Sequence, residues 1–80
     1  MPIAGVIIMT EPRSADQVLS ELQAIDGVQT YGIHKQNNIV AVFDTNDAAE
    51  LKNLSERIRS EISGVAGVYL SNVNYEEPEI

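Results

Sequence analysis

The apolar and polar residues of this chain recur with two different periods, and each period predicts one type of secondary structure. Four stretches are rich in β-branched and other apolar residues and are separated by turn-forming residues, which is typical of β-strands. Two other stretches carry apolar residues at every third or fourth position, which is typical of amphipathic helices. The predicted elements are, in order, strand 3–10, helix 14–25, strand 28–34, strand 39–43, helix 48–62 and strand 68–75.

Short polar residues and glycines predict where the two helices begin and end. Ser14 and Gln17 have the spacing of a capping box, in which each side chain hydrogen-bonds the backbone N–H of the other residue. The Asp-Thr-Asn-Asp segment at 44–47 supplies capping residues for the second helix. Gly27 is suited to the left-handed conformation that ends many helices, and the segment 64–67 is expected to end the second helix.

This order of elements predicts a ferredoxin-like fold, in which two β-α-β halves interleave and right-handed crossovers place both helices on one face. A faint internal repeat supports the two halves, since Ile-Asp-Gly-Val at 25–28 is echoed by Val-Ala-Gly-Val at 65–68. The polar segment 35–38 predicts a hairpin turn between the middle strands. We therefore expect an α+β sandwich of βαββαβ order over residues 1–75, with a four-stranded antiparallel sheet, two helices on one face, and an acidic C-terminal tail at 76–80.

The predicted sheet has one face that no helix covers. Side chains alternate between the two faces of a strand, so if Val6 and Ile8 point toward the helices, the residues that alternate with them point away. An exposed apolar patch of this kind usually marks an interface. A shift of one residue in the alternation of a strand would move all of its outward-facing side chains to the other face of the sheet. We expect the uncovered face to carry Ile7, Met9, Val40, Val42 and Leu70.

The amino-acid composition limits the classes of molecule that this protein is expected to bind. The 80 residues include 12 acidic and 5 basic residues, and the net charge of −7 would repel nucleic-acid phosphates and attract a basic peptide, or simply keep the protein soluble. The absence of cysteine excludes disulfides, thiolate-bound zinc and thiol redox chemistry. The apolar runs in strand-like sequence, such as 6–9, are far too short to span a membrane, and we expect no secretory signal at the start of the chain. We expect a cytoplasmic protein that binds neither nucleic acid nor membrane directly.

The residue types that carry out catalysis are not grouped in this sequence. His34 is the single histidine, and no cysteine stands at metal-ligand spacing from it. No serine lies in a nucleophile-elbow pattern, and no glycine-rich loop is suited to phosphate. The carboxylates are spread out except at Glu76, Glu77 and Glu79, which either form a solvated tail or bind arginines through paired hydrogen bonds. We expect no catalytic residue, no metal and no cofactor.

Several stretches of packing residues carry a distinctive pattern over most of the chain. They are Gly-Val-Ile-Ile at 5–8, Leu-Ser-Glu-Leu at 19–22, Ile-Asp-Gly-Val at 25–28, Asn-Ile-Val-Ala-Val-Phe-Asp at 38–44, the helix end at 58–67, and Gly-Val-Tyr-Leu-Ser-Asn-Val-Asn-Tyr-Glu at 67–76. Together they resemble the NapD family, the small assembly chaperones of periplasmic nitrate reductase.

The resemblance implies a cytoplasmic, ferredoxin-like chaperone that is not an enzyme and carries no cofactor. Such proteins bind the twin-arginine signal peptide of the nitrate reductase catalytic subunit, a molybdenum enzyme, and delay its export until cofactor insertion and folding are complete. An acidic domain with an uncovered apolar sheet face complements a signal that has a basic end and an apolar stretch. On this interpretation the peptide-binding residues are Ile7, Met9, Val40, Val42, Leu70, Glu76 and Glu77.

Two other function classes stay open at the level of the residues. A ligand-sensing or oligomerising ferredoxin-like regulatory module would pair sheet to sheet, although Thr-Glu-Pro-Arg at 10–13 stands where such modules have a glycine-rich ligand loop. A small enzyme such as an acylphosphatase needs an arginine in a phosphate loop, and Arg13 lies in the right loop without the neighbouring pattern. Fold alone does not decide among these classes.

Overall fold

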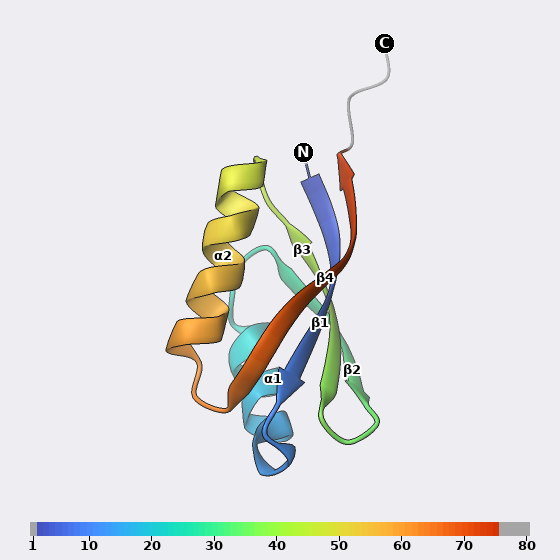
Figure 1. Cartoon of the computed structure of the whole chain (residues 1–80), viewed down its shortest axis with the longest axis vertical. Helices are drawn as coiled ribbons and strands as arrows, with labels where there is room; N and C mark the ends of the chain where they lie inside the picture. The colour runs from blue at the N-terminus through green and yellow to red at the C-terminus, as the bar shows by residue number, and fades with distance from the viewer. Residues whose placement is uncertain (1, 76–80) are drawn as a thin grey trace.

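The computed structural model describes residues 2–75, with side chains for residues 3–71. The chain forms four strands and two helices in the predicted order, with a short 3-10 turn (η1) before the first helix (Figure 1). The elements are β1 Pro2–Thr10, η1 Pro12–Ser14, α1 Ala15–Gln23, β2 Val28–His34, β3 Asn38–Asp44, α2 Ala48–Glu61 and β4 Val65–Tyr75.

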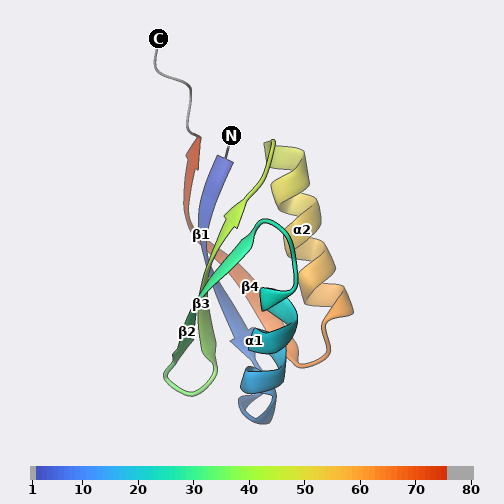
Figure 2. The same ribbon diagram turned by 180° about the vertical axis from the view of Figure 1, so that it is seen from behind.

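All four strands belong to one antiparallel sheet, in the order β2-β3-β1-β4. The strand β1 therefore lies at the centre beside β3 and β4, and β2 and β4 form the edges. Both helices lie on the same side of this sheet, and the other side carries no element of the described chain (Figures 1 and 2). This arrangement confirms the predicted ferredoxin-like α+β fold.

The core lies between the sheet and the two helices. Val6 and Ile8 of β1 are only 1% and 0% exposed, which confirms the phase expected for that strand. In β3 the buried positions alternate with half-buried ones, so the strand presents one face to the helices and the other face away from them. The core consists of Ala4, Val6, Ile8, Val18, Leu22, Ile39, Ala41, Phe43, Leu51, Leu54 and Ile58.

The two helices begin differently, and only one of the predicted caps is present. Asp47 caps α2, because its Oδ1 accepts a hydrogen bond of 2.7 Å from the backbone N–H of Glu50. The predicted capping box at Ser14 is wrong, since that side chain makes no capping hydrogen bond with the described residues. Pro12 begins the 3-10 turn η1, which leaves Ser14 in helical geometry (φ −103°, ψ −3°) instead of the extended geometry that a capping residue adopts.

The turn after α2 is shorter than predicted, so a different segment of the second half corresponds to residues 25–28. Gly64 alone, at φ +95°, ends the turn, and Val65 already pairs with Thr10, so β4 begins three residues earlier than expected. Val65 N–H donates to the Ile62 carbonyl at 3.3 Å, and Val28 N–H donates to the Ile25 carbonyl at the same distance. The segment 62–65 is therefore the counterpart of 25–28, and the predicted match with 65–68 is wrong.

Two strands carry irregularities that set which residues share a face. In β2 the pairing shifts between Thr30 and Ile33, so that two residues, one of them Gly32 at φ +98°, lie opposite a single residue of β3. In β4 the pairing shifts at Ser71, whose hydroxyl donates to the Gly5 carbonyl at 3.0 Å. The predicted hairpin is present, and Lys35 takes one of its two positive φ angles.

Candidate functional site

The face of the sheet that lies away from the helices is apolar at its centre, and we call it the open face. Ile7 of β1 pairs with Val40 of β3 on one side and with Tyr69 of β4 on the other. Residues directly opposite each other in an antiparallel pair point to the same face, so these three side chains form a row across the sheet. Met9 and Val42 flank this row, since each lies two residues along a strand from a member of it.

The open-face side chains are partly exposed. Ile7, Val40 and Val42 are half-buried, because each packs sideways against its neighbours on adjacent strands, and Met9 is 37% exposed. The structure thus places four of the predicted site residues together on one face. Their role in binding stays a prediction. The predicted site residues Glu76 and Glu77 lie outside the described residues.

Leu70 lies on the other side of the sheet, so its predicted position on the open face is wrong. It pairs with Val6, whose side chain is buried beneath the helices, and it is 46% exposed. There it lines a groove of about 490 Å³ between β4 and α2. The residues of this groove are Ala48, Leu51, Lys52, Ser55, Glu56, Arg59, Val68 and Leu70.

Tyr69 takes the place on the open face that was predicted for Leu70. It is 55% exposed, and its ring lies over Gly67, because a Cβ added to Gly67 would stand 2.8 Å from the ring atom Cε2. Gly67 pairs with Met9, so the ring lies along the strand beside the end of β1. The sequence signal that was missed is the glycine two residues before an aromatic residue, on the same face of one strand.

One end of the open face carries the Asp44 carboxylate, and Asp26 lies beside it toward the helices. The backbone N–H of Asp44 donates to the Gly27 carbonyl at 2.7 Å, which places the end of β3 beside the turn that contains Asp26. Both carboxylates are exposed, and neither lies within 4.0 Å of a lysine, arginine or histidine nitrogen among the described residues. A hollow of about 340 Å³ opens at this end. Its lining is Ile3, Gly27, Val28, Gln29, Val42 and Asp44.

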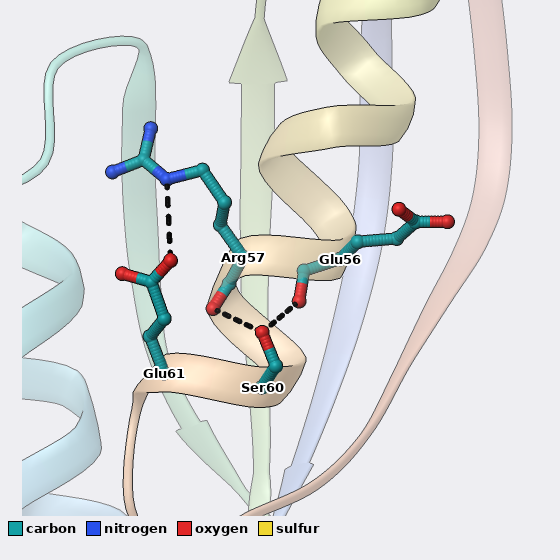
Figure 3. A network of polar contacts seen from close by, with 4 residues as sticks. All are labelled: Glu56, Arg57, Ser60 and Glu61. Atoms are coloured by element: carbon teal, nitrogen blue, oxygen red, sulfur yellow. Dashed lines mark hydrogen bonds and ion pairs between the residues drawn. The ribbon is translucent and has the colours of Figure 1, made fainter.

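Figure 3 shows polar contacts that Arg57, Ser60 and Glu61 make within α2. Arg57 Nε lies 3.8 Å from Glu61 Oε2, with both side chains 65% exposed, so this ion pair adds little stability. Ser60 Oγ donates to the carbonyl oxygens of Glu56 and Arg57 at 2.8 and 3.5 Å. Arg57 also lines a hollow of about 480 Å³ on the helix side of Asp44.

The described residues offer few groups for other chemistry. Within residues 2–75, no three histidine, cysteine, aspartate or glutamate side chains gather closely enough to hold a metal ion. Neither of the two described helices is long and apolar enough to cross a membrane. His34 is exposed at the end of β2.

Comparison with known proteins places the chain in a family. The NapD protein family model matches residues 1–79. The solution structure of the E. coli Tat proofreading chaperone protein NapD superposes with a TM-score of 0.77, over 96% of this chain and 78% of that chain, at 18% sequence identity. No curated protein sequence matches. The structural likeness at this identity shows a shared fold, and the match over almost the whole sequence shows that the chain belongs to the NapD family.

Proposed function

We propose that this protein is a cytoplasmic chaperone that binds the twin-arginine signal peptide of the catalytic subunit of a periplasmic nitrate reductase. Family membership supports the class of client, and the relative of known structure is described as a Tat proofreading chaperone. The observation that carries the proposal is the open face, where the row of Val40, Ile7 and Tyr69 leaves apolar surface uncovered by any described element.

The chemistry of the open face complements both parts of such a signal. The apolar stretch of the peptide would bury Ile7, Val40, Val42 and Met9, which are already gathered on one face and need no rearrangement to bind. The net charge of −7 attracts the basic end of the peptide and raises the rate of encounter.

Binding alone is sufficient for the proofreading role that we propose. A signal peptide that lies on the open face has its apolar stretch buried, so the export machinery competes with the chaperone for it. The delay then lasts as long as the complex does, and the chaperone needs no catalytic group. Release follows when the peptide dissociates, after the client has received its molybdenum cofactor and folded.

Calorimetric titration tests the proposal. We expect a peptide with the twin-arginine signal to bind at tens of micromolar or tighter, which is a free energy of roughly −6 kcal/mol or more favourable. A twin-lysine peptide should bind more weakly, because lysine lacks the planar fork of donors that arginine presents to a carboxylate. Absence of binding to either peptide, together with a stable dimer, would favour the sensing or oligomerising module instead.

Two matched variants locate the site. Val40→Asp places a charge in the middle of the open face and should weaken binding at least about tenfold, because the peptide must desolvate that charge. Leu70→Asp makes the same kind of change on the opposite side of the sheet, in the groove beside α2, and should leave binding unchanged. Loss of binding in Leu70→Asp alone would move the site to that groove.

A further inference from the structure

The open face has an acidic end and a basic end. The acidic end holds Asp44, and the hydrogen bond between Asp44 N–H and the Gly27 carbonyl places the turn with Asp26 beside it, toward the helices. On the helix side of the same end, Glu50 and Arg57 line a hollow with both carboxylates, and Arg57 is ion-paired with Glu61.

The opposite end of the open face carries the hairpin between β2 and β3. His34 and Lys35 are exposed there, and Lys35 has φ +52°. The hairpin is held against the end of β1, because Thr10 N–H donates to the Asn37 carbonyl at 2.9 Å and Asn37 Nδ2 donates to the Thr10 carbonyl at 3.3 Å. Glu11 and Arg13, which follow the end of β1, carry opposite charges, so the positive charge of the hairpin itself comes from Lys35.

The apolar part of the open face lies between these two ends. On β1 it runs from Ile3, which pairs with Asp44, to Met9, which pairs with Asn38 in the first position of β3. Six residues of strand span roughly 20 Å, so the face has room for an apolar segment of similar length. A peptide that covers it must place one of its ends near Asp44 and the other near Lys35.

The hollow at the acidic end has the character of an arginine site. Ile3 and Val42 provide apolar walls, and Asp44 and Gln29 provide oxygen acceptors at the rim. An arginine side chain buries its methylene stem on such walls while its guanidinium group stays at a carboxylate. The hollow and the exposed Asp44 carboxylate thus lie at the same end of the open face.

We infer that the signal peptide binds the open face in one direction, with its twin arginines at the hollow beside Asp44 and its apolar stretch running along Val40 and Ile7 toward the Lys35 hairpin. The inference rests on the proposed function. Attraction at the acidic end favours this direction, and repulsion between the arginines and Lys35 of the hairpin disfavours the reverse one. The acidic end therefore fixes orientation, and the apolar row supplies most of the buried area.

Paramagnetic labels on the peptide report the direction in which it lies on the open face. The protein has no cysteine, so a nitroxide attached to a cysteine at one end of the peptide labels the peptide alone. A label at the arginine end should broaden the amide signals of Gln29 and Asp44 most, and a label beyond the apolar stretch should broaden those of Lys35 and Asn38 most. The reverse pattern, or equal broadening at both ends, overturns the inference while leaving peptide binding intact.

A charge-swap variant tests whether electrostatic attraction causes the preferred direction of the peptide. The double variant Asp44→Lys with Lys35→Glu changes the charge by +2 and −2, so the net charge stays at −7 while the two ends exchange sign. We expect the broadening pattern to reverse or to become mixed. The control, Asp16→Lys with Lys52→Glu, makes the same swap on the exposed sides of α1 and α2 and should keep the original pattern. An unchanged pattern in the first variant, with a folded amide spectrum, overturns the electrostatic origin of the direction.

A single neutralisation gives a quantitative check. Asp44→Asn should weaken binding about threefold, because an exposed ion pair contributes less than about 1 kcal/mol. Asp16→Asn removes the same charge from α1 and should leave the affinity unchanged. Equal effects of the two variants overturn the role of Asp44. If the wild-type protein fails to bind the peptide at all, the proposed function itself fails.

Discussion

At the scale of single residues, two glycines with positive φ differ in how closely another backbone approaches them. Gly27, at φ +83°, precedes β2, and a Cβ at this position would stand 2.7 Å from the carbonyl oxygen of Asp44. Gly32, at φ +98°, lies in the irregular part of β2, and no described atom would lie within 4 Å of its Cβ. Both positions need glycine for its backbone conformation, but only Gly27 also needs it for space.

Replacement of each glycine by alanine separates these two requirements. Gly32→Ala should lower the free energy of unfolding by about 1 kcal/mol, the cost of a left-handed conformation in a residue with a Cβ. Gly27→Ala should cost at least about twice as much, because the added methyl group also pushes against the backbone of Asp44. Urea denaturation measures both values. Equal losses would contradict the close approach of Gly27 to Asp44.

At the scale of elements, the two helices start from different kinds of turn. The cap on α2 is a hydrogen bond from the Glu50 N–H to the Asp47 carboxylate, and Asn46 Nδ2 also donates to Glu50 Oε2 at 3.1 Å. By contrast, α1 continues directly from the 3-10 turn η1, whose Ser14 N–H donates to the Glu11 carbonyl at 2.9 Å. The start of α1 therefore relies on backbone contacts, and the start of α2 relies on a side chain.

Alanine substitution at the two helix starts should therefore have unequal effects. Asp47→Ala should lower the free energy of unfolding by about 1 kcal/mol, because the Glu50 N–H loses its partner. Ser14→Ala should cost less than half as much, since its hydroxyl group caps no described backbone group. Thermal and urea denaturation give both values, and Asp47→Asn, which keeps an acceptor oxygen, should recover most of the loss. A larger loss for Ser14→Ala than for Asp47→Ala would contradict the structure and support the capping box predicted at Ser14.

The secondary-structure elements also differ in how well the sequence predicts them. Helix periodicity, the Asp47 cap and the Gly27 turn are set by residues within about four positions of one another, so the sequence predicts them. The face on which Leu70 lies depends on the pairing of β4 with β1, which is far away in the chain. Residues 68–70 are all apolar or aromatic, so alternation alone leaves the phase of this strand undetermined.

At the scale of the whole molecule, charge and shape act on different steps of binding. The net charge of −7 is a property of the whole surface and accelerates the approach of a basic peptide. Under the proposed function, the apolar row on the open face acts only after contact and determines how slowly the peptide complex dissociates. Ionic strength should therefore affect the two rates unequally.

Stopped-flow measurement with a fluorescent twin-arginine peptide tests this separation. Because the Debye length falls from about 30 Å at 0.01 M to about 3 Å at 1 M salt, the association rate constant should fall about tenfold or more across that range. The dissociation rate constant should change much less. A control peptide with glutamines in place of the arginines should associate at a rate that depends only weakly on salt. Equal salt dependence for both peptides would contradict steering by the acidic surface.

The position of β1 between β3 and β4 has a consequence for the time at which the open face forms. The first strand of the chain pairs with the last, so the sheet requires a contact between distant parts of the sequence, and such contacts slow folding. On the ribosome, β1, β2 and β3 emerge well before β4, which contributes Tyr69 to the apolar row. A nascent chain therefore completes the apolar row only after β4 has left the ribosome and paired with β1, and under the proposed function it can bind a signal peptide only from then on.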